Sequence, residues 1–343
     1  MKIFKYLLFL ILILIIGTSI YVATLKGDFQ VEETRLINAP QEVVFNEVNE
    51  LRNWQDWEPW SGDAQDMIVN YGDTTSGENA TYAWKSESMG NGKITTTKAN
   101  PFSSIQQKIT FETSFGESSS DVYWNFEETE NGTQVTWGMK GEQSFMEKAA
   151  FMFRDESITE MMRPEFAEGL QNMEQAIEKK MNVYSINVDG ITQHGGGYYM
   201  YTTTASKVSQ IDEKMGNMIE DIAAYMDQNN IERTGNPFVL YNEWNQENNS
   251  AIFSAAYFTP SEVITPAESP VLTGYMPNQK VVKTTLKGNY DKLQETWDRA
   301  YAFIQENDLQ LSTEEKAFEV YLVGPDKSKN PADWVTSIYI PVQ

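Results

Sequence analysis

The C-terminal half of the chain shows the same order of secondary-structure elements twice, and this repeat constrains the fold more than any other sequence feature. Hydrophobic periodicity and turn residues predict a strand, a helix and two further strands in each copy. The two predicted helices end at equivalent points, Asn230 and Asp308. The predicted elements are strand 197–204, helix 208–229 and strands 237–244 and 251–258 in the first copy, and strand 279–286, helix 291–307 and strands 317–323 and 334–342 in the second.

One position differs sharply between the two copies. When residues 237–241 are aligned with residues 317–321, Val239 of the first copy is replaced by Glu319 in the second. Alternate residues of a strand share a face, so Glu319 and Tyr321 point the same way. A carboxylate in such a strand needs a partner or a function, because burying it alone is costly. A salt-bridged structural role for Glu319 is the competing interpretation.

Three segments of the second copy resemble the GyrI-like effector-binding family, which includes the ligand domains of multidrug-responsive transcription activators. They are Lys287-Gly288-Asn289-Tyr290, residues 318–325 and residues 334–342. The resemblance implies a pseudo-twofold sheet with a central cleft for amphipathic or cationic aromatic molecules, and a central buried glutamate at Glu319. Some stand-alone members hydrolyse strained cyclopropane compounds with a glutamate and nearby aromatic hydroxyls. Regulators of the family carry a DNA-binding domain, for which this sequence shows no motif.

Three functions follow from these residues. The first is ligand binding without catalysis, in which Glu319 is the counter-charge of a cationic ligand and aromatic faces supply cation–π contacts. The second is hydrolysis, with Glu319 as acid, base or nucleophile and Tyr321 assisting. The third is a structural or envelope-stress role with vestigial clefts. The predicted ligand-binding residues are Glu319, Tyr321, Tyr241, Trp244, Tyr257, Tyr275 and Trp334.

The segments between these elements are less regular. Residues 181–191 read as a connection that begins with a short strand at 183–188, and the proline-containing loop 259–277 is either a lid or a spacer.

Residues 28–181 show the order of a helix-grip fold: a strand, short helices, an antiparallel meander and a long closing helix at 161–180. The turns Asn91-Gly92 and Asn131-Gly132 are predicted hairpins of the meander. Three segments resemble the START-like (SRPBCC, polyketide-cyclase-like) superfamily. They are residues 37–45, the tryptophan-rich stretch 54–60, and Trp137-Gly138-Met139-Lys140-Gly141 with Gly169-Leu170 in the helix that follows.

The START-like resemblance implies a hydrophobic cavity between the sheet and the long helix, occupied by a lipid-like or other apolar ligand. Trp54, Trp57 and Trp60 are the aromatic candidates for its wall, and packing in the core or at its rim is the competing interpretation. No catalytic constellation is evident in this segment, since its carboxylates are scattered and it contains no histidine.

The N-terminal residues 3–25 form an apolar run long enough to cross a membrane, which requires about 20 residues. Lys2 precedes the run and Lys5 lies near its start, before the uninterrupted part that begins at Tyr6, and positive charge favours the cytoplasmic side. We therefore expect a single-pass anchor with the N-terminus in the cytoplasm and the domains on the periplasmic or extracellular side. The alternative is a signal peptide with an apolar region at 7–16, followed by secretion of the cleaved chain.

Composition excludes several function classes. The net charge of −23 opposes binding to nucleic-acid phosphates, and the absence of cysteine excludes disulfides and thiolate ligands. His194 is the only histidine, and no nucleophile motif accompanies it. We expect no metal and no cofactor, and a small hydrophobic or amphipathic ligand and the membrane as partners. The predicted fold class is α+β: an anchor at 1–27, a START-like helix-grip domain at 28–181 and a tandem β-α-β-β GyrI-like domain at 182–343.

Overall fold

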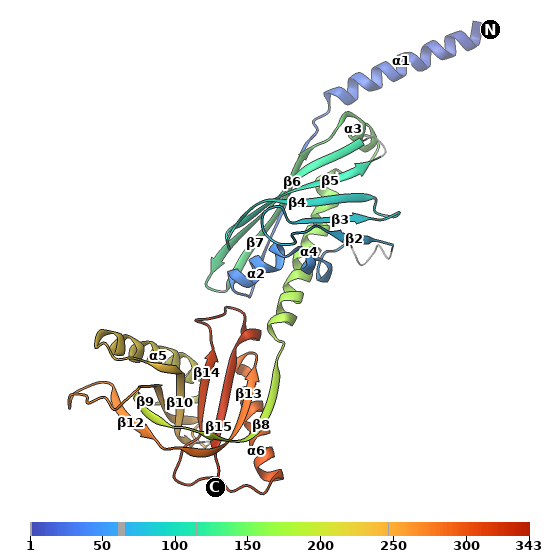
Figure 1. Cartoon of the computed structure of the whole chain (residues 1–343). Helices are drawn as coiled ribbons and strands as arrows, with labels where there is room; N and C mark the ends of the chain where they lie inside the picture. Colours follow the sequence, from blue (N-terminus) through green and yellow to red (C-terminus); the bar gives the residue numbers. More distant parts are fainter. Residues whose placement is uncertain (1, 61–65, 114–115, 246) are drawn as a thin grey trace. The chain divides into compact units, whose positions relative to one another are not determined.

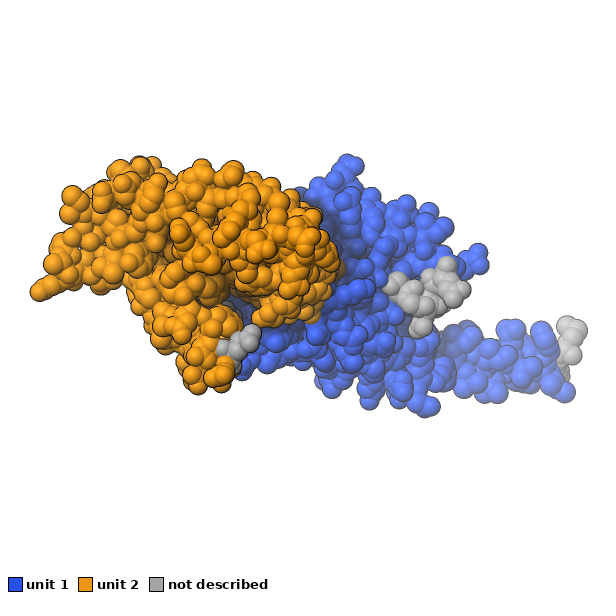
Figure 2. All heavy atoms as spheres, turned by 90° about the horizontal axis from the view of Figure 1, so that it is seen from below, with its two compact units in different colours: residues 1–179 blue, residues 180–343 orange. Residues whose placement is uncertain are grey.

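The computed structural model describes residues 2–60, 66–113, 116–245 and 247–343. The chain divides into two compact units, residues 1–179 and 180–343 (Figure 2), and each has its own antiparallel sheet (Figure 1). This mixed α+β architecture confirms the predicted fold class, and each unit is described separately below.

The N-terminal helix α1 (Lys2–Thr24) is apolar over Ile3–Thr24, with a mean hydropathy of 2.6. Its length and composition suit a membrane span, and a signal sequence would satisfy the same criterion. The C-terminal end of the helix packs against the rest of the first unit: Val22 is buried, and the carbonyl of Leu25, just after the helix, accepts a hydrogen bond from Lys148 Nζ at 3.2 Å. The backbone N–H of Gln143 donates to the Gly27 carbonyl at 2.9 Å.

The first unit is a seven-stranded antiparallel sheet in the order β1-β7-β6-β5-β4-β3-β2, and the long helix α4 (Ile158–Met181) lies along it (Figure 1). The buried side of α4 presents Phe166, Leu170, Met173 and Ile177, which recur every three or four residues. This is the helix-grip arrangement. The other elements are β1 (Asp28–Ile37), α2 (Gln41–Asn49), η1 (Leu51–Asp56), β2 (Ile68–Tyr71), β3 (Thr81–Lys85), β4 (Asn91–Asn100), β5 (Ser104–Thr113), β6 (Gly116–Thr129), β7 (Gly132–Glu142) and α3 (Phe145–Phe151).

The predicted hairpin turn at Asn91-Gly92 was wrong. Both residues lie in β4, and the reversal precedes them, between Lys85 and Asn91. A Cβ at Gly92 would lie 2.2 Å from the Trp84 ring, so this glycine gives room for an indole that crosses the strand. The other predicted turn is observed one residue early, at Glu130 and Asn131, and β2 and α3 were not predicted.

The second unit is an eight-stranded antiparallel sheet in the order β12-β9-β11-β10-β14-β15-β13-β8. The repeat is visible in this order, because β10 and β14, equivalent strands of the two copies, pair at the centre. Val239 lies directly opposite Glu319 in that pair. The elements are β8 (Ser185–His194), β9 (Gly197–Lys207), η2 (Val208–Gln210), α5 (Ile211–Gln228), β10 (Thr234–Asn245), β11 (Ser250–Phe258), β12 (Leu272–Met276), β13 (Gln279–Lys287), η3 (Tyr290–Lys292), α6 (Leu293–Glu306), β14 (Phe318–Val323), η4 (Pro331–Asp333) and β15 (Val335–Pro341).

The two helices of the repeat end in the same way. Asn230 and Asp308 each follow a helix with a φ of 53°, the left-handed conformation that ends many helices. Two segments differ from expectation. The loop after β11 contains the edge strand β12, and the strand predicted at 183–188 extends from Ser185 to His194 along β13.

Candidate functional site

Glu319 lies at the pseudo-twofold centre of the second unit. Its strand β14 runs between β10 and β15, so its backbone is paired on both sides. The side chain is 1% exposed and lies on the sheet face that carries α6, since Trp297 of that helix reaches it. The opposite copy places Val239, also fully buried, at the equivalent position.

Trp297, Tyr241 and Tyr321 donate hydrogen bonds to this carboxylate. Trp297 Nε1 donates to Oε1 at 2.6 Å, and both tyrosines donate to Oε2: Tyr321 OH at 2.5 Å and Tyr241 OH at 3.0 Å. Tyr241 and Tyr321 occupy equivalent positions of the two copies, so the repeat supplies one hydroxyl from each side. A carboxylate that is ionised only accepts hydrogen bonds, and this arrangement of donors matches that state.

Tyr321 is the more buried of the two tyrosines, at 6% exposure. Burial raises the pKa of its hydroxyl well above the ordinary value, and the negative charge of Glu319 raises it further. Tyr321 is therefore a neutral hydrogen-bond donor to Glu319 at physiological pH.

Further rings surround this group and are only partly buried. Tyr290 packs edge-on against Tyr321 with ring centroids 5.5 Å apart, and Trp334 packs on Tyr290 at 4.6 Å. On the other side of the carboxylate, Trp244 and Trp297 both contact Tyr241 edge-on at 5.8 Å. Glu319 is thus a buried carboxylate behind a layer of half-exposed aromatic rings.

Not all of the residues proposed from the sequence gather here. Tyr241 and Tyr321 contact Glu319 directly, Trp244 lies one ring away on Tyr241, and Trp334 lies two rings away, beyond Tyr290 and Tyr321. Tyr257 packs against the same core cluster but lies under the Arg233 guanidinium, at 5.6 Å. Tyr275 is 60% exposed and packs against Tyr198 at the β12 edge of the sheet.

Sequence reasoning missed two members of this group, Trp297 and Tyr290. The signals were available: Trp297 lies on the apolar face of the second helix of the repeat, and Tyr290 belongs to the motif Lys287-Gly288-Asn289-Tyr290. The sole histidine, His194, lies elsewhere, packed edge-on against Phe318 at 4.9 Å, and burial lowers its pKa. Within the residues that the structure describes, no cluster of three or more potential metal ligands occurs.

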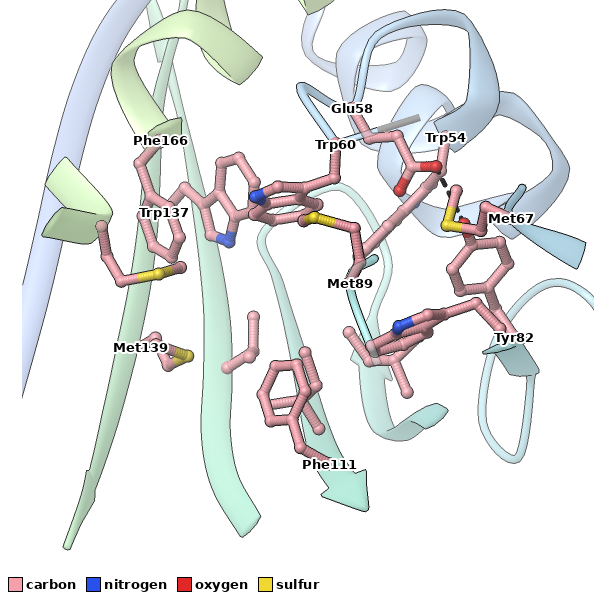
Figure 3. Close-up of a pocket in the computed structure, with 15 residues that line it drawn as sticks. Trp54, Glu58, Trp60, Met67, Tyr82, Met89, Phe111, Trp137, Met139 and Phe166 are labelled. Carbon is pink, nitrogen blue, oxygen red and sulfur yellow. Dashed lines mark hydrogen bonds between the residues drawn. The ribbon is translucent and has the colours of Figure 1, made fainter. Parts of the chain in front are cut away.

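The first unit contains a cavity of about 200 Å³ against the sheet (Figure 3). It is walled mainly by aromatic, aliphatic and methionine side chains. Glu58 and Tyr82 contribute polar groups to the wall, and the Tyr82 hydroxyl donates to Glu58 Oε1 at 2.8 Å. The lining residues are Trp54, Glu58, Trp60, Met67, Tyr82, Trp84, Met89, Ile94, Ile109, Phe111, Val122, Trp137, Met139, Met162 and Phe166.

The tryptophan-rich stretch 54–60 contributes to both the core and this cavity. Trp54 and Trp60 line the cavity, whereas Trp57 is a core residue at 1% exposure. The Trp137 indole is stacked between Trp124 and Phe166, with centroid distances of 4.6 and 4.0 Å. The wall is therefore fixed by ring packing.

Family models match both units. Residues 28–178 match the model described as polyketide cyclase / dehydrase and lipid transport, and residues 179–343 match the GyrI-like small molecule binding domain. The chain therefore carries a START-like domain followed by a GyrI-like domain. Both domains are small-molecule-binding domains, as their family descriptions state or imply. No curated protein matches the chain significantly.

Three similar solved structures each cover less than half of this chain, at low identity. The C-terminal domain of EcmrR is 18% identical, with 47% of this chain and 98% of that chain covered and a TM-score of 0.36. A Staphylococcus epidermidis protein solved by NMR is 19% identical, with 46% and 93% covered and a TM-score of 0.33. The Aha1 dimer from Colwellia psychrerythraea is 13% identical, with 44% and 96% covered and a TM-score of 0.33.

Proposed function

We propose that this chain is a membrane-anchored binding protein for hydrophobic or amphipathic cations, which the GyrI-like domain holds on the rings around Glu319. The observation that carries the proposal is the 1% exposed Glu319 carboxylate behind half-exposed aromatic rings. Such rings bind apolar molecules in general, and the carboxylate adds selectivity for positive charge.

The expected selectivity follows from Coulomb's law and from ring electrostatics. A cation about 6 Å from a carboxylate gains about 3 kcal/mol at an effective dielectric constant near 20. Contact with the face of an aromatic ring adds about 0.5–2 kcal/mol. Solvent at the half-exposed rings reduces both contributions, so we expect the charge to increase affinity by about tenfold to a hundredfold.

The hydrogen bonds to Glu319 support this role. The hydroxyls and the indole N–H are neutral donors, so they fix the carboxylate without neutralising it. A fixed charge behind an aromatic surface requires little reorganisation when a ligand arrives. The apolar helix α1 supports the membrane location, because it would hold the domain where hydrophobic cations concentrate.

A matched pair of probes tests the charge argument. We would titrate the full chain in lipid nanodiscs with 10-methylacridinium and with its neutral isostere 9-methylanthracene, following ligand fluorescence and subtracting empty nanodiscs. Glu319→Gln should weaken binding of the cation at least tenfold and leave the neutral probe within about twofold. Glu314→Gln, an equal charge change at an exposed position, is the control. Equal losses for both probes would remove the basis of the proposal.

The same site supports a second candidate, hydrolysis of small electrophilic compounds. The observation that favours it is the 2.5 Å contact between the Tyr321 hydroxyl and Glu319, because a neutral tyrosine beside a carboxylate can donate a proton to a leaving group. Incubating the purified chain with electrophilic cyclopropane compounds tests it. Turnover that Glu319→Gln abolishes would support hydrolysis, and absence of turnover across a broad panel would count against it.

The membrane topology we propose places the N-terminus in the cytoplasm and both domains outside. Fractionation followed by protease treatment of intact cells and of spheroplasts measures it. Protection of the domains in spheroplasts would contradict this topology, and release of a shortened chain into the soluble fraction would indicate a cleaved signal peptide instead.

A further inference from the structure

The cavity of the START-like domain contains one charged side chain among its lining residues, Glu58. Glu58 is 6% exposed, and its Oε1 accepts a hydrogen bond from the 3% exposed Tyr82. Figure 3 shows this pair at one side of the cavity. Taking a carboxylate out of water costs several kcal/mol even after relaxation, so a carboxylate at a cavity wall is an unusual and specific feature.

Aromatic rings share the cavity with this carboxylate. The indoles of Trp54, Trp60 and Trp84 line it together with the Tyr82 ring. Ring faces attract cations, and the attraction grows when water is excluded. The cavity therefore combines a negative charge with ring faces, which is the chemistry of an organic-cation site.

A further polar group, besides Glu58 and Tyr82, lines the cavity. Trp137 is 2% exposed, and its Nε1 has no hydrogen-bond partner among the residues that the structure describes. Stacking on Trp124 and Phe166 holds the ring, so the N–H cannot turn to find a partner. Buried N–H groups are nearly always paired, so this N–H is available to an acceptor on a molecule bound in the cavity.

We propose that this cavity binds a compact hydrophobic organic cation whose charged group lies against Glu58 and whose hydrogen-bond acceptor meets Trp137 Nε1. The cavity volume of about 200 Å³ is smaller than that of typical ligand pockets, which is about 300–1,000 Å³, so the site favours a small molecule over a diacyl lipid. This site is separate from the one around Glu319, since every residue of it belongs to residues 1–179.

Two isosteric esters test the proposal. Benzoylcholine carries a quaternary ammonium and an ester carbonyl, and 3,3-dimethylbutyl benzoate replaces the charged nitrogen with carbon. Both are titrated by calorimetry into the full chain in nanodiscs, in a Glu319→Gln background that removes the charge of the other site. The measured quantity is the ratio of the two affinities within each variant, which cancels losses of folded protein.

We expect the ratio to favour benzoylcholine at least tenfold, to fall to within about twofold of unity in Glu58→Gln, and to persist in Glu58→Asp. Glu112→Gln, on the exposed side of β5 next to the lining residue Phe111, should leave the ratio unchanged. Trp137→Phe should weaken both esters equally, because both contain the carbonyl. A ratio near unity before mutation, or a ratio that Glu58→Gln does not change, would overturn the proposal.

Discussion

The two tyrosines that donate to Glu319 provide a matched test of how its charge is held. Tyr241 and Tyr321 are equivalent residues of the repeat and donate to the same oxygen, at 3.0 and 2.5 Å. They differ in burial, since Tyr321 is 6% exposed and Tyr241 is half-buried. The same substitution, tyrosine to phenylalanine, removes one hydroxyl in each case and retains the ring.

We expect Tyr321→Phe to cost about 1.5–3 kcal/mol of local stability, the value of a buried hydrogen bond to a charged group. Tyr241→Phe should cost about 0.5–1 kcal/mol, because its bond is longer and water can replace the lost hydroxyl at a half-exposed position. Trp297→Phe should fall between them, since its 2.6 Å bond is short but the indole is only partly buried.

The measurement is hydrogen exchange followed by mass spectrometry, which reports the opening free energy of β10 and β14 separately from the START-like domain. A double-mutant cycle with Glu319→Gln then isolates the pairwise coupling, expected to be larger for Tyr321 than for Tyr241. Equal losses for the two tyrosines, or no coupling between Tyr321 and Glu319, would refute this account of the site.

Three further predictions concern packing, pH and helix ends. Gly169→Ala would place a Cβ 2.7 Å from the Trp137 ring, so we expect the free energy of unfolding, measured by thermal denaturation, to fall by about 1–3 kcal/mol, offset in part by about 1 kcal/mol of helix propensity. A stabilised variant would mean that the Trp137 ring can move aside. The Ser88 hydroxyl and other hydrogen bonds lower the pKa of Asp66 to about 2. The stabilisation that the Asp66 carboxylate gives the β3–β4 turn is therefore complete above the unfolded pKa of about 4 and is lost as pH falls through about 2. Hydrogen exchange at residues 86–89 should rise over that interval in the native protein but not in Asp66→Asn. Because φ is 53° at both Asn230 and Asp308, glycine at either position should leave the free energy of unfolding nearly unchanged, whereas valine should lower it by about 1–3 kcal/mol. Equal effects of glycine and valine would contradict the left-handed helix ends.

Periodicity was sufficient to predict the long elements of both domains. The helices α4, α5 and α6 were expected within a few residues of their observed ends, because their apolar positions recur every three or four residues. Short or edge elements escaped: β2 has four residues and β12 five, too few for a period-2 pattern to stand out from a loop. The turn at Asn91-Gly92 failed because Gly92 is required beneath the Trp84 ring rather than in a reversal.

Residues of the site were predictable where equivalent positions of the two copies could be compared, and they were missed where no such comparison was possible. Comparing Val239 with Glu319 identified the carboxylate, and the equivalence of Tyr241 and Tyr321 identified two of its donors. Trp297 donates from a helix to a strand 22 residues away, and no local pattern encodes such a contact. The Glu58–Tyr82 pair, separated by 24 residues, escaped for the same reason.

The position of Glu319 follows from the duplication itself. A pseudo-twofold sheet pairs equivalent strands at its centre, so residues of both copies can converge on one side chain there. Two identical carboxylates across that pair would repel each other at close range in a buried setting. A single carboxylate opposite a valine avoids this repulsion and still receives hydroxyls from both copies. Replacing Val239 with glutamate should therefore destabilise the domain far more than exchanging the two residues, and the hydrogen-exchange assay above distinguishes these variants.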